Sequence, residues 1–174
     1  YEIRPRDWSS DVCSSDLFRL DLDLGFVDPK PRQLLEHWRS KFRGALLPSR
    51  AQFEPQELMD HLAHIIILEA EPERRDFRYR LVGTEIVECV GRDVTGKLVS
   101  EAYDERALRV FNYLVDNRMP GRIFGRVDWQ DKPFIHYETL MLPLADDGRT
   151  VDRLLGEMVF PPHIDGVDQP DLSD

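Results

Sequence analysis

The sequence predicts an α+β fold built on a five-stranded antiparallel sheet. Two short stretches of strand-like apolar pattern come first, a long amphipathic helical stretch follows, and three further strand-like stretches come near the end of the chain. Short turns separate the neighbouring strands within each group. A parallel return would need a crossover of a dozen or more residues, so these neighbours must pair antiparallel.

Length and charge limit the class of protein. The chain has 174 residues, which suits one domain of ordinary size. It carries 33 acidic and 23 basic residues, a formal net charge of −10. Non-specific binding to nucleic acid or to anionic membranes depends on an excess of Lys and Arg, so neither is expected as a partner. No apolar run approaches the roughly 20 residues that span a bilayer.

The first 17 residues are predicted to be an artefactual or disordered segment. They show neither helical nor strand periodicity, and Asp7 to Leu17 back-translate into an adapter of the kind ligated to DNA fragments for short-read sequencing. Residues 1–17 are therefore left out of the reasoning about fold and function. Without Cys13, Cys89 has no intrachain disulfide partner, which favours a reducing compartment and predicts a cytoplasmic location.

Residues 18–46 are predicted to carry an N-terminal flanking helix. Asp28 followed by Pro29 is a helix-start signature, because the carboxylate accepts hydrogen bonds from free N–H groups and proline suits the first turn. Gly44 is expected to end the helix. Apolar residues recur at helical spacing between these points: Leu34, Leu35, Trp38 and Phe42.

The main domain is predicted to span residues 47–160 and an acidic tail residues 161–174. A short helix should start at Glu54-Pro55, with Leu58, Met59 and Leu62 on one face. The run from Ile65 to Ala70 favours a buried strand. The next stretch alternates between an apolar set and two arginines, which predicts a second strand paired with the first in a hairpin. The residues of that strand are Phe77, Tyr79 and Leu81 on one face and Arg78 and Arg80 on the other.

A short helix ending at Gly91 is expected next, followed by a loop-like stretch with short helical pieces from residue 92 to 103. Asp104 can then cap the longest helix, which Met119–Gly121 stop. Its apolar stripe comprises Ala107, Leu108, Phe111, Leu114 and Val115. The last three strands are predicted at residues 123–129, 134–142 and 151–160.

Several short stretches, in this order and spacing, resemble the PAS domain superfamily, and in particular the short alphaproteobacterial-type PAS family. They run from about residue 34 to 160 and comprise Trp38–Ser40, Leu47–Arg50, Phe77–Thr84, Gly91–Gly96, Tyr137–Glu138, Leu142–Leu144, Asp146–Arg149 and Val151–Arg153. The resemblance implies one five-stranded antiparallel sheet with helices on one face and room for a small ligand between them. It also implies a sensory or protein-interaction module without catalysis, which signals through a separate partner protein.

The candidate ligand site lies between the long helix and the sheet. If the apolar side chains of the strands face the helices, they would enclose a mostly apolar pocket with a few hydroxyl groups, as is usual for a small-molecule site. The candidate residues are Phe77, Tyr79, Leu81, Phe111, Leu114, Val115, Tyr137, Thr139 and Met141. The alternative is that these large side chains fill the core, which would leave a structural dimerisation module.

The other face of the sheet is also expected to be apolar, because Phe134, Leu140 and Leu142 alternate with the pocket residues. Such a face needs cover. The flanking helix can provide it from the same chain or from a second subunit, and we expect a homodimer formed through this helix.

Other chemistry is weighed against structural roles. His136 and Glu138 share a strand face, so a small enzyme using both for proton transfer is the less favoured alternative. His61 and His64 beside Asp60 lack a fourth ligand at metal-site spacing, so no metal is expected. Four arginines could contact an anion or a partner, or simply be solvated: Arg78, Arg80, Arg126 and Arg153.

No cofactor is assigned. Cys89 lacks the neighbours of a flavin-adduct cysteine and is interpreted as a buried structural thiol. Residues 101–120 contain no histidine that could ligate haem iron. Flavin and haem are therefore both disfavoured.

Overall fold

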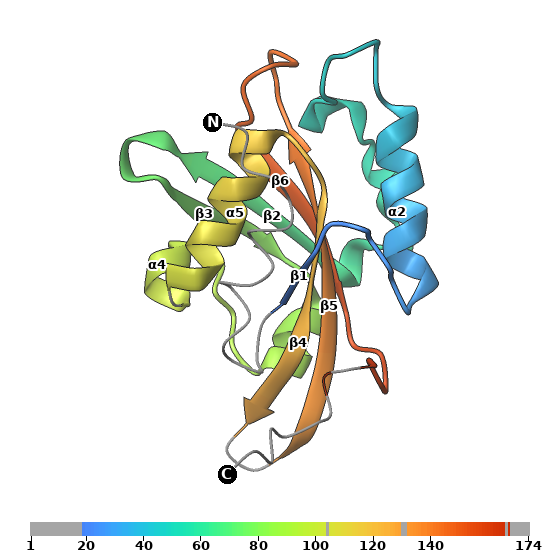
Figure 1. Ribbon diagram of the computed structural model, residues 1–174, viewed down its shortest axis with the longest axis vertical. Helices are drawn as coiled ribbons and strands as arrows, with labels where there is room; N and C mark the ends of the chain where they lie inside the picture. The colour runs from blue at the N-terminus through green and yellow to red at the C-terminus, as the bar shows by residue number, and fades with distance from the viewer. Residues whose placement is uncertain (1–18, 104, 130–131, 166, 168–174) are drawn as a thin grey trace.

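A computed structural model describes residues 19–103, 105–129, 132–165 and 167, without the side chains of residues 127–134. Outside the described residues therefore lie the segment 1–17 with Cys13, Asp104, the side chain of Phe134, and residues 166 and 168–174 of the tail. One antiparallel sheet organises the chain, with the strand order β1-β4-β5-β6-β2-β3 (Figure 1). The strands are β1 (Arg19–Asp21), β2 (Ile65–Glu71), β3 (Asp76–Val82), β4 (Gly121–Trp129), β5 (Lys132–Leu144) and β6 (Arg153–Val159).

The five predicted strands are confirmed, and β1 is a sixth strand that the sequence analysis missed. It has only three residues, too few to show a strand period, and pairs with the edge of β4 through Leu20 opposite Ile123. The prediction of five strands is therefore wrong by one short edge strand.

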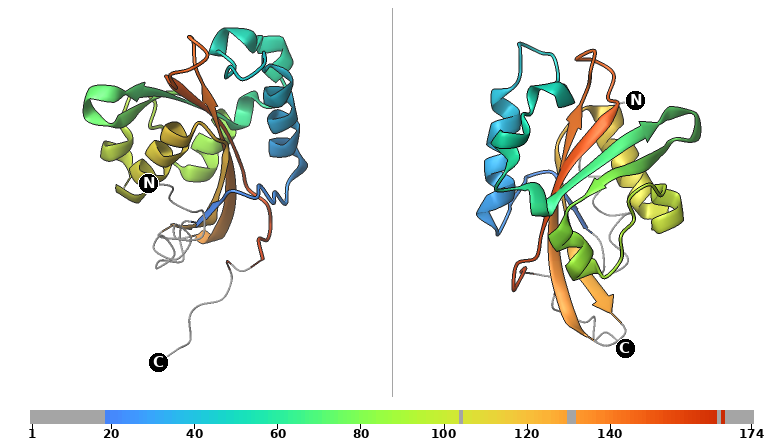
Figure 2. Two further views of the ribbon diagram at one scale, coloured as in Figure 1. Left: turned by 45° about the horizontal axis from the view of Figure 1, so that its top comes forward. Right: turned by 180° about the vertical axis from the view of Figure 1, so that it is seen from behind.

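Helices cover both faces of the sheet (Figure 2). On one face lie α3 (Thr84–Val90), α4 (Val99–Ala102) and α5 (Glu105–Asn117), and on the other lies α2 (Pro29–Ser40). Four 3-10 turns complete the fold: η1 (Arg50–Gln52), η2 (Pro55–Leu58), η3 (Leu62–His64) and η4 (Pro72–Arg74). None of the helices in the described ranges is long and apolar enough to span a bilayer.

The long helix α5 packs its apolar stripe against β3 and β5. Leu114 is fully buried, and the ring of Phe111 meets that of Phe77 edge-on with 5.8 Å between centroids. Gly121 at the start of β4 admits this packing, because a Cβ there would lie 2.7 Å from a methyl carbon of Leu114. The helix is thus held directly over the sheet.

The flanking helix α2 lies against β5 and β6 of its own chain. Leu34 and Leu35 are buried, and the indole of Trp38 donates a hydrogen bond to the carbonyl oxygen of Pro143 at 3.1 Å. Phe42 is half-buried and stacks edge-on against Trp38 with 4.6 Å between ring centroids. Of the two ways to cover this face, the structure shows cover from the same chain.

The helix predicted after Glu54 is wrong. The segment forms the two 3-10 turns η2 and η3, in which Leu58 is buried but Met59 and Leu62 are 65% and 40% exposed. A close backbone contact fixes this path, because a Cβ on Gly83 would lie 2.2 Å from the carbonyl oxygen of Ala63. The chain therefore turns tightly into β2 instead of extending as a regular helix.

The strict alternation predicted for β3 is also interrupted. Ile67 pairs with Leu81 and Leu68 pairs with Tyr79, which leaves Arg80 as an extra residue in a β-bulge. A bulge shifts the side-chain alternation by one residue. Phe77 and Tyr79 are buried as expected, whereas Leu81 is 37% exposed.

Replacing the helix cap Asp28 with alanine is expected to lower the free energy of unfolding by about 1 kcal/mol, because its carboxylate accepts the backbone N–H of Lys30 at 2.8 Å. Asp28→Ser should restore most of the loss, since serine is an equally good cap. Urea unfolding measures both variants, and equal stability of Asp28→Ala and the unchanged protein would contradict a capping role.

Candidate functional site

A cavity of about 110 Å³ lies between the sheet and the helices α3 and α5. Its wall is mainly aliphatic and aromatic. The polar groups in the wall are four hydroxyls and one guanidinium, from Tyr79, Tyr103, Tyr137, Thr139 and Arg92. One water needs roughly 10–15 Å³ of such space, so the cavity exceeds a few water volumes. This volume argues against a completely filled core.

Five of the nine candidate pocket residues line this cavity: Tyr79, Phe111, Tyr137, Thr139 and Met141. Alternation along β5 places the last three on one face, and Thr139 lies between Ile123 of β4 and Met158 of β6. Both of these neighbours also line the cavity. The pairing of β4, β5 and β6 therefore brings together the side chains that line the cavity on the sheet side.

The other four candidates lie elsewhere. Phe77 packs behind Phe111, and Leu114 packs against Gly121, both outside the wall of the cavity. Val115 is half-buried on α5 and does not line the cavity. Leu81 is turned away by the bulge in β3, and Val82 lines the cavity instead.

The part of the wall that α3 and the segment after it, up to the end of α4, contribute was not predicted from the sequence. These residues are Ile86, Val90, Arg92, Val94 and Tyr103. The apolar spacing in α3 was visible in the sequence, but it did not indicate that the helix closes a pocket. Ile66, Val82, Ala107, Ile123 and Met158 complete the wall and were not named as pocket residues either.

Three of the polar groups, from Tyr79, Tyr103 and Arg92, lie together at one corner of the cavity. Burial raises the pKa of Tyr79 far above its ordinary value, so its hydroxyl stays protonated and can donate a hydrogen bond. Its ring lies 6.3 Å from that of Tyr103. The guanidinium carbon of Arg92 lies 4.9 Å from the Tyr103 ring centroid, and its Nη2 donates to the carbonyl oxygen of Ala102 at 2.8 Å. A positive charge is thereby held at the edge of an otherwise apolar site.

The cavity is small for the flavin that was disfavoured. An apolar cavity of about 150 Å³ holds a single benzene ring, so the three-ring system of a flavin exceeds this space. Cys89 is half-buried instead of buried, contacts Glu85 at 3.9 Å and does not line the cavity. Among the described side chains that do line it there is no histidine for a haem iron.

Glu138 lies on the opposite face of β5 and is fully buried. Its carboxylate accepts the backbone N–H groups of Val27 at 3.1 Å and Asp28 at 2.7 Å, and pairs with Arg122 at 2.8 Å. Arg122 also pairs with Asp21 of β1 at 3.2 Å. The network ties β1 and the start of α2 to the sheet.

The enzyme alternative required His136 and Glu138 to open into the cavity, and this placement is wrong. Both are buried side chains that do not line the cavity, and His136 Nδ1 lies 3.2 Å from the carbonyl oxygen of Pro162. Glu138 is fully engaged by the network around Arg122. The structure therefore gives the pair no access to a ligand in the cavity.

The two candidate metal-binding histidines have other contacts. His61 Nδ1 lies 2.7 Å from Glu157 Oε1, and His64 Nδ1 lies 3.1 Å from the carbonyl oxygen of Met158. Within the described part of the chain, no group of three or more His, Cys, Asp or Glu residues could hold a metal ion.

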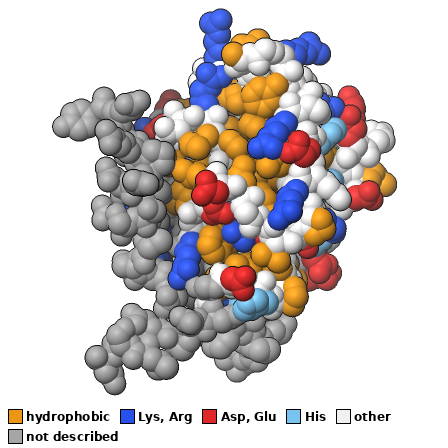
Figure 3. Space-filling model, turned by 45° about the vertical axis from the view of Figure 1, so that its right-hand side comes forward, with side chains coloured by type: hydrophobic (Ala, Val, Ile, Leu, Met, Phe, Trp, Pro, Cys, Tyr) orange, Lys and Arg blue, Asp and Glu red, His pale blue; other side chains and the backbone are white. Residues whose placement is uncertain are grey.

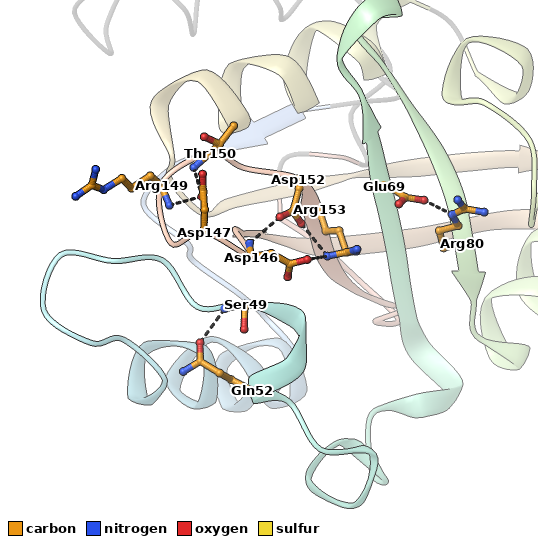
Figure 4. A network of polar contacts seen from close by, with 10 residues as sticks. All are labelled: Ser49, Gln52, Glu69, Arg80, Asp146, Asp147, Arg149, Thr150, Asp152 and Arg153. Carbon is orange, nitrogen blue, oxygen red and sulfur yellow. Dashed lines mark hydrogen bonds and ion pairs between the residues drawn. The ribbon is translucent and has the colours of Figure 1, made fainter.

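Three of the four candidate arginines form ion pairs across the sheet edge and the β5–β6 turn. Arg78 pairs with Glu71 at 2.8 Å. Arg80 pairs with Glu69, and Arg153 with Asp146 at 2.8 Å (Figure 4). The fourth, Arg126, also has an interaction partner. These pairs favour a structural interpretation over an anion site.

The chain matches the family model described as PAS domain over residues 27–159. No curated protein matches it. Among solved structures it is similar to the blue-light photoreceptor Aureochrome1 LOV in its light state, with a TM-score of 0.44 and 12% identity over 63% of this chain and 89% of that one.

Two further structures have comparable scores. A light-oxygen-voltage domain studied with a flavin analogue has a TM-score of 0.44 and 13% identity over 64% of this chain and 87% of that one. An RNA-binding light-oxygen-voltage receptor has a TM-score of 0.43 and 18% identity over 69% of this chain and 37% of that one. The chain thus spans little more than a third of this receptor.

The family match and the fold agree. The matched residues include α2, the cavity and five of the six strands, all but β1. PAS domains are sensory and interaction modules, and the resemblance that the sequence showed is confirmed. The chain belongs to the PAS domain family.

Proposed function

We propose that this PAS domain senses a small, mainly apolar molecule in the cavity between α5 and the sheet and signals through a partner protein. The observation that carries the proposal is the cavity of about 110 Å³, whose apolar wall contains a few polar groups. Small-molecule sites have this composition.

Strand β5 offers a route from the cavity to the other face of the sheet. Tyr137 and Thr139 line the cavity, while Glu138 between them holds the backbone N–H groups of Val27 and Asp28 at the start of α2. A ligand that moves β5 would also move the anchor of α2. The proposed signal therefore leaves through the layer that contains this helix.

The partner is proposed to contact the α2 side of the molecule. Four of the large exposed hydrophobic side chains belong to residues 27–62, which include α2: Val27, Leu46, Met59 and Leu62. Hydrophobic side chains gather along the middle of this surface between single acidic and basic ones (Figure 3). A second copy of the chain in the cytoplasm is the proposed partner. It would contact the outer surface of this layer, because the inner apolar residues of α2 are buried.

The neutral alcohol 2-methylpropan-1-ol tests the cavity, because it is mainly apolar and smaller than a single benzene ring, which needs about 150 Å³. At ten times its Kd it should stabilise the protein by about 1.4 kcal/mol, which raises Tm by roughly 3–6 °C. Ala107→Leu places extra methyl groups at the wall and should abolish the increase in Tm. Ala45→Leu, on the exposed loop after α2, serves as the matched control and should leave it unchanged.

The competing function is a dimerisation module without a ligand. It predicts the same dimer but no increase in Tm with 2-methylpropan-1-ol or any other small apolar probe. Calorimetric titration with the same probe separates the two functions.

A further inference from the structure

We propose that the cavity takes a small monocarboxylic acid, with its apolar body inside the cavity and its carboxylate at Arg92. This inference rests on the proposed function and adds the chemical class of the ligand. Its basis is the position of a guanidinium at the edge of an apolar cavity, with no carboxylate of the described residues in an ion pair with it.

Arg92, in the loop after α3, takes no part in the ion pairs that engage four arginines of the sheet. Arg78, Arg80, Arg122 and Arg153 each pair with a carboxylate. Across the described residues, no carboxylate lies within ion-pair distance of the Arg92 guanidinium. In a chain with 33 acidic residues against 23 basic ones, a cation without such a partner beside a cavity favours an anionic ligand.

The Arg92 side chain is already held in place. One N–H group donates to the carbonyl oxygen of Ala102 at 2.8 Å, and the guanidinium plane lies over the Tyr103 ring at 4.9 Å. These contacts leave other guanidinium N–H groups for a ligand, because arginine has five donors. A preorganised guanidinium loses less conformational freedom when it binds a carboxylate.

A neighbouring hydroxyl can add a second hydrogen bond. Tyr79 lines the cavity and is 6% exposed. Burial raises the pKa of Tyr79, Tyr103 raises it further, and the charge of Arg92 opposes this. The Tyr79 hydroxyl therefore stays a donor and lies within electrostatic reach of Arg92. A carboxylate at this corner would accept from both groups.

The rest of the wall limits the body of the acid. A cavity of about 110 Å³ is smaller than the roughly 150 Å³ that accommodates benzene, so a short branched chain fits better than a ring with substituents. No Asp or Glu belongs to the part of the wall that the structure describes. The ammonium group of an α-amino acid would have no charged partner there, so a simple acid is favoured over an amino acid.

The test compares three probes of nearly equal shape by calorimetric titration at pH 7: 3-methylbutanoate, 3-methylbutanamide and valine. The acid should bind about tenfold or more tightly than the amide, as expected for charge-assisted hydrogen bonds, and valine should bind no better than the amide. Arg92→Gln should reduce the affinity for the acid to that for the amide and leave the amide unchanged. Arg149→Gln, whose side chain extends away from its neighbours on the β5–β6 turn (Figure 4), should change neither.

Equal binding of acid and amide, or an acid preference that survives Arg92→Gln, overturns the inference. If neutral probes such as the amide or 2-methylpropan-1-ol bind without an acid preference, the proposed apolar ligand site stands and only the inference about the acid fails. If no probe binds, both fail.

Discussion

Glu138→Gln is expected to lower the free energy of unfolding by about 3 kcal/mol, although the two side chains have nearly the same shape. The change leaves the buried charge of Arg122 with Asp21 alone, at 3.2 Å. It also replaces an acceptor oxygen by an NH₂ group that would face a backbone N–H of Val27 or Asp28. Both effects arise in a fully buried site, where water cannot compensate for the lost contacts.

Glu69→Gln is the matched control. Glu69 pairs with Arg80 on the exposed part of the hairpin, where the Glu69 side chain is 31% exposed and the Arg80 side chain 56% exposed. Removing an exposed pair changes stability by less than about 1 kcal/mol. Urea unfolding gives both values. A loss for Glu138→Gln no larger than that for Glu69→Gln would mean that the network does not anchor β1 and α2.

The network around Glu138 also shows what the sequence could not predict. The prediction of β5 from its alternating pattern was right, and so was the placement of Tyr137 and Thr139 on one face. The role of Glu138 depends on N–H groups more than a hundred positions away in the chain. Such a pairing leaves no local pattern, so the carboxylate was interpreted as half of an acid–base pair.

The same distinction applies to the cavity. Apolar periodicity predicted α5 and the two faces of β3 as far as Tyr79. The bulge at Arg80 then reversed the direction of Leu81, and nothing in the local sequence indicates an extra residue there. Arg92 and Tyr103 were placed correctly in a loop, but only the path of that loop brings them to the cavity.

The position of α2 could be predicted only as a pair of alternatives. The sequence showed that both faces of the sheet are apolar and that this helix has an apolar stripe, but it could not tell cover by the same chain from cover by a second one. The path of the chain into α2 determines that the cover comes from the same chain. Glu138 accepts the backbone N–H of Val27, and the helix then runs over β5 and β6. A mutation of a buried apolar residue of α2 therefore tests how the helix packs within one chain.

Trp38→Ala is expected to cost about 3–5 kcal/mol of unfolding free energy, the usual range for truncating a large aromatic side chain in a core. Trp38 is 4% exposed, contacts the Phe42 ring, and donates to the carbonyl oxygen of Pro143 at the end of β5. Arg39→Ala removes the exposed neighbour of Trp38, which pairs with Glu36 on the same helix, and should cost less than about 1 kcal/mol.

Protein concentration separates the two ways in which α2 could contribute. Because Trp38 is buried within one chain, the loss in Trp38→Ala should be the same in urea unfolding at low and at hundredfold higher protein concentration. A dimer formed through the outer surface of this layer, as proposed above, would raise the midpoints of both proteins equally with concentration. If the helix instead covered a second subunit, only the midpoint of the unchanged protein would rise, and the variant would lose that dependence. This last result would show that α2 is exchanged between two copies of the chain, and the cover of β5 and β6 described above would then have to come from the partner.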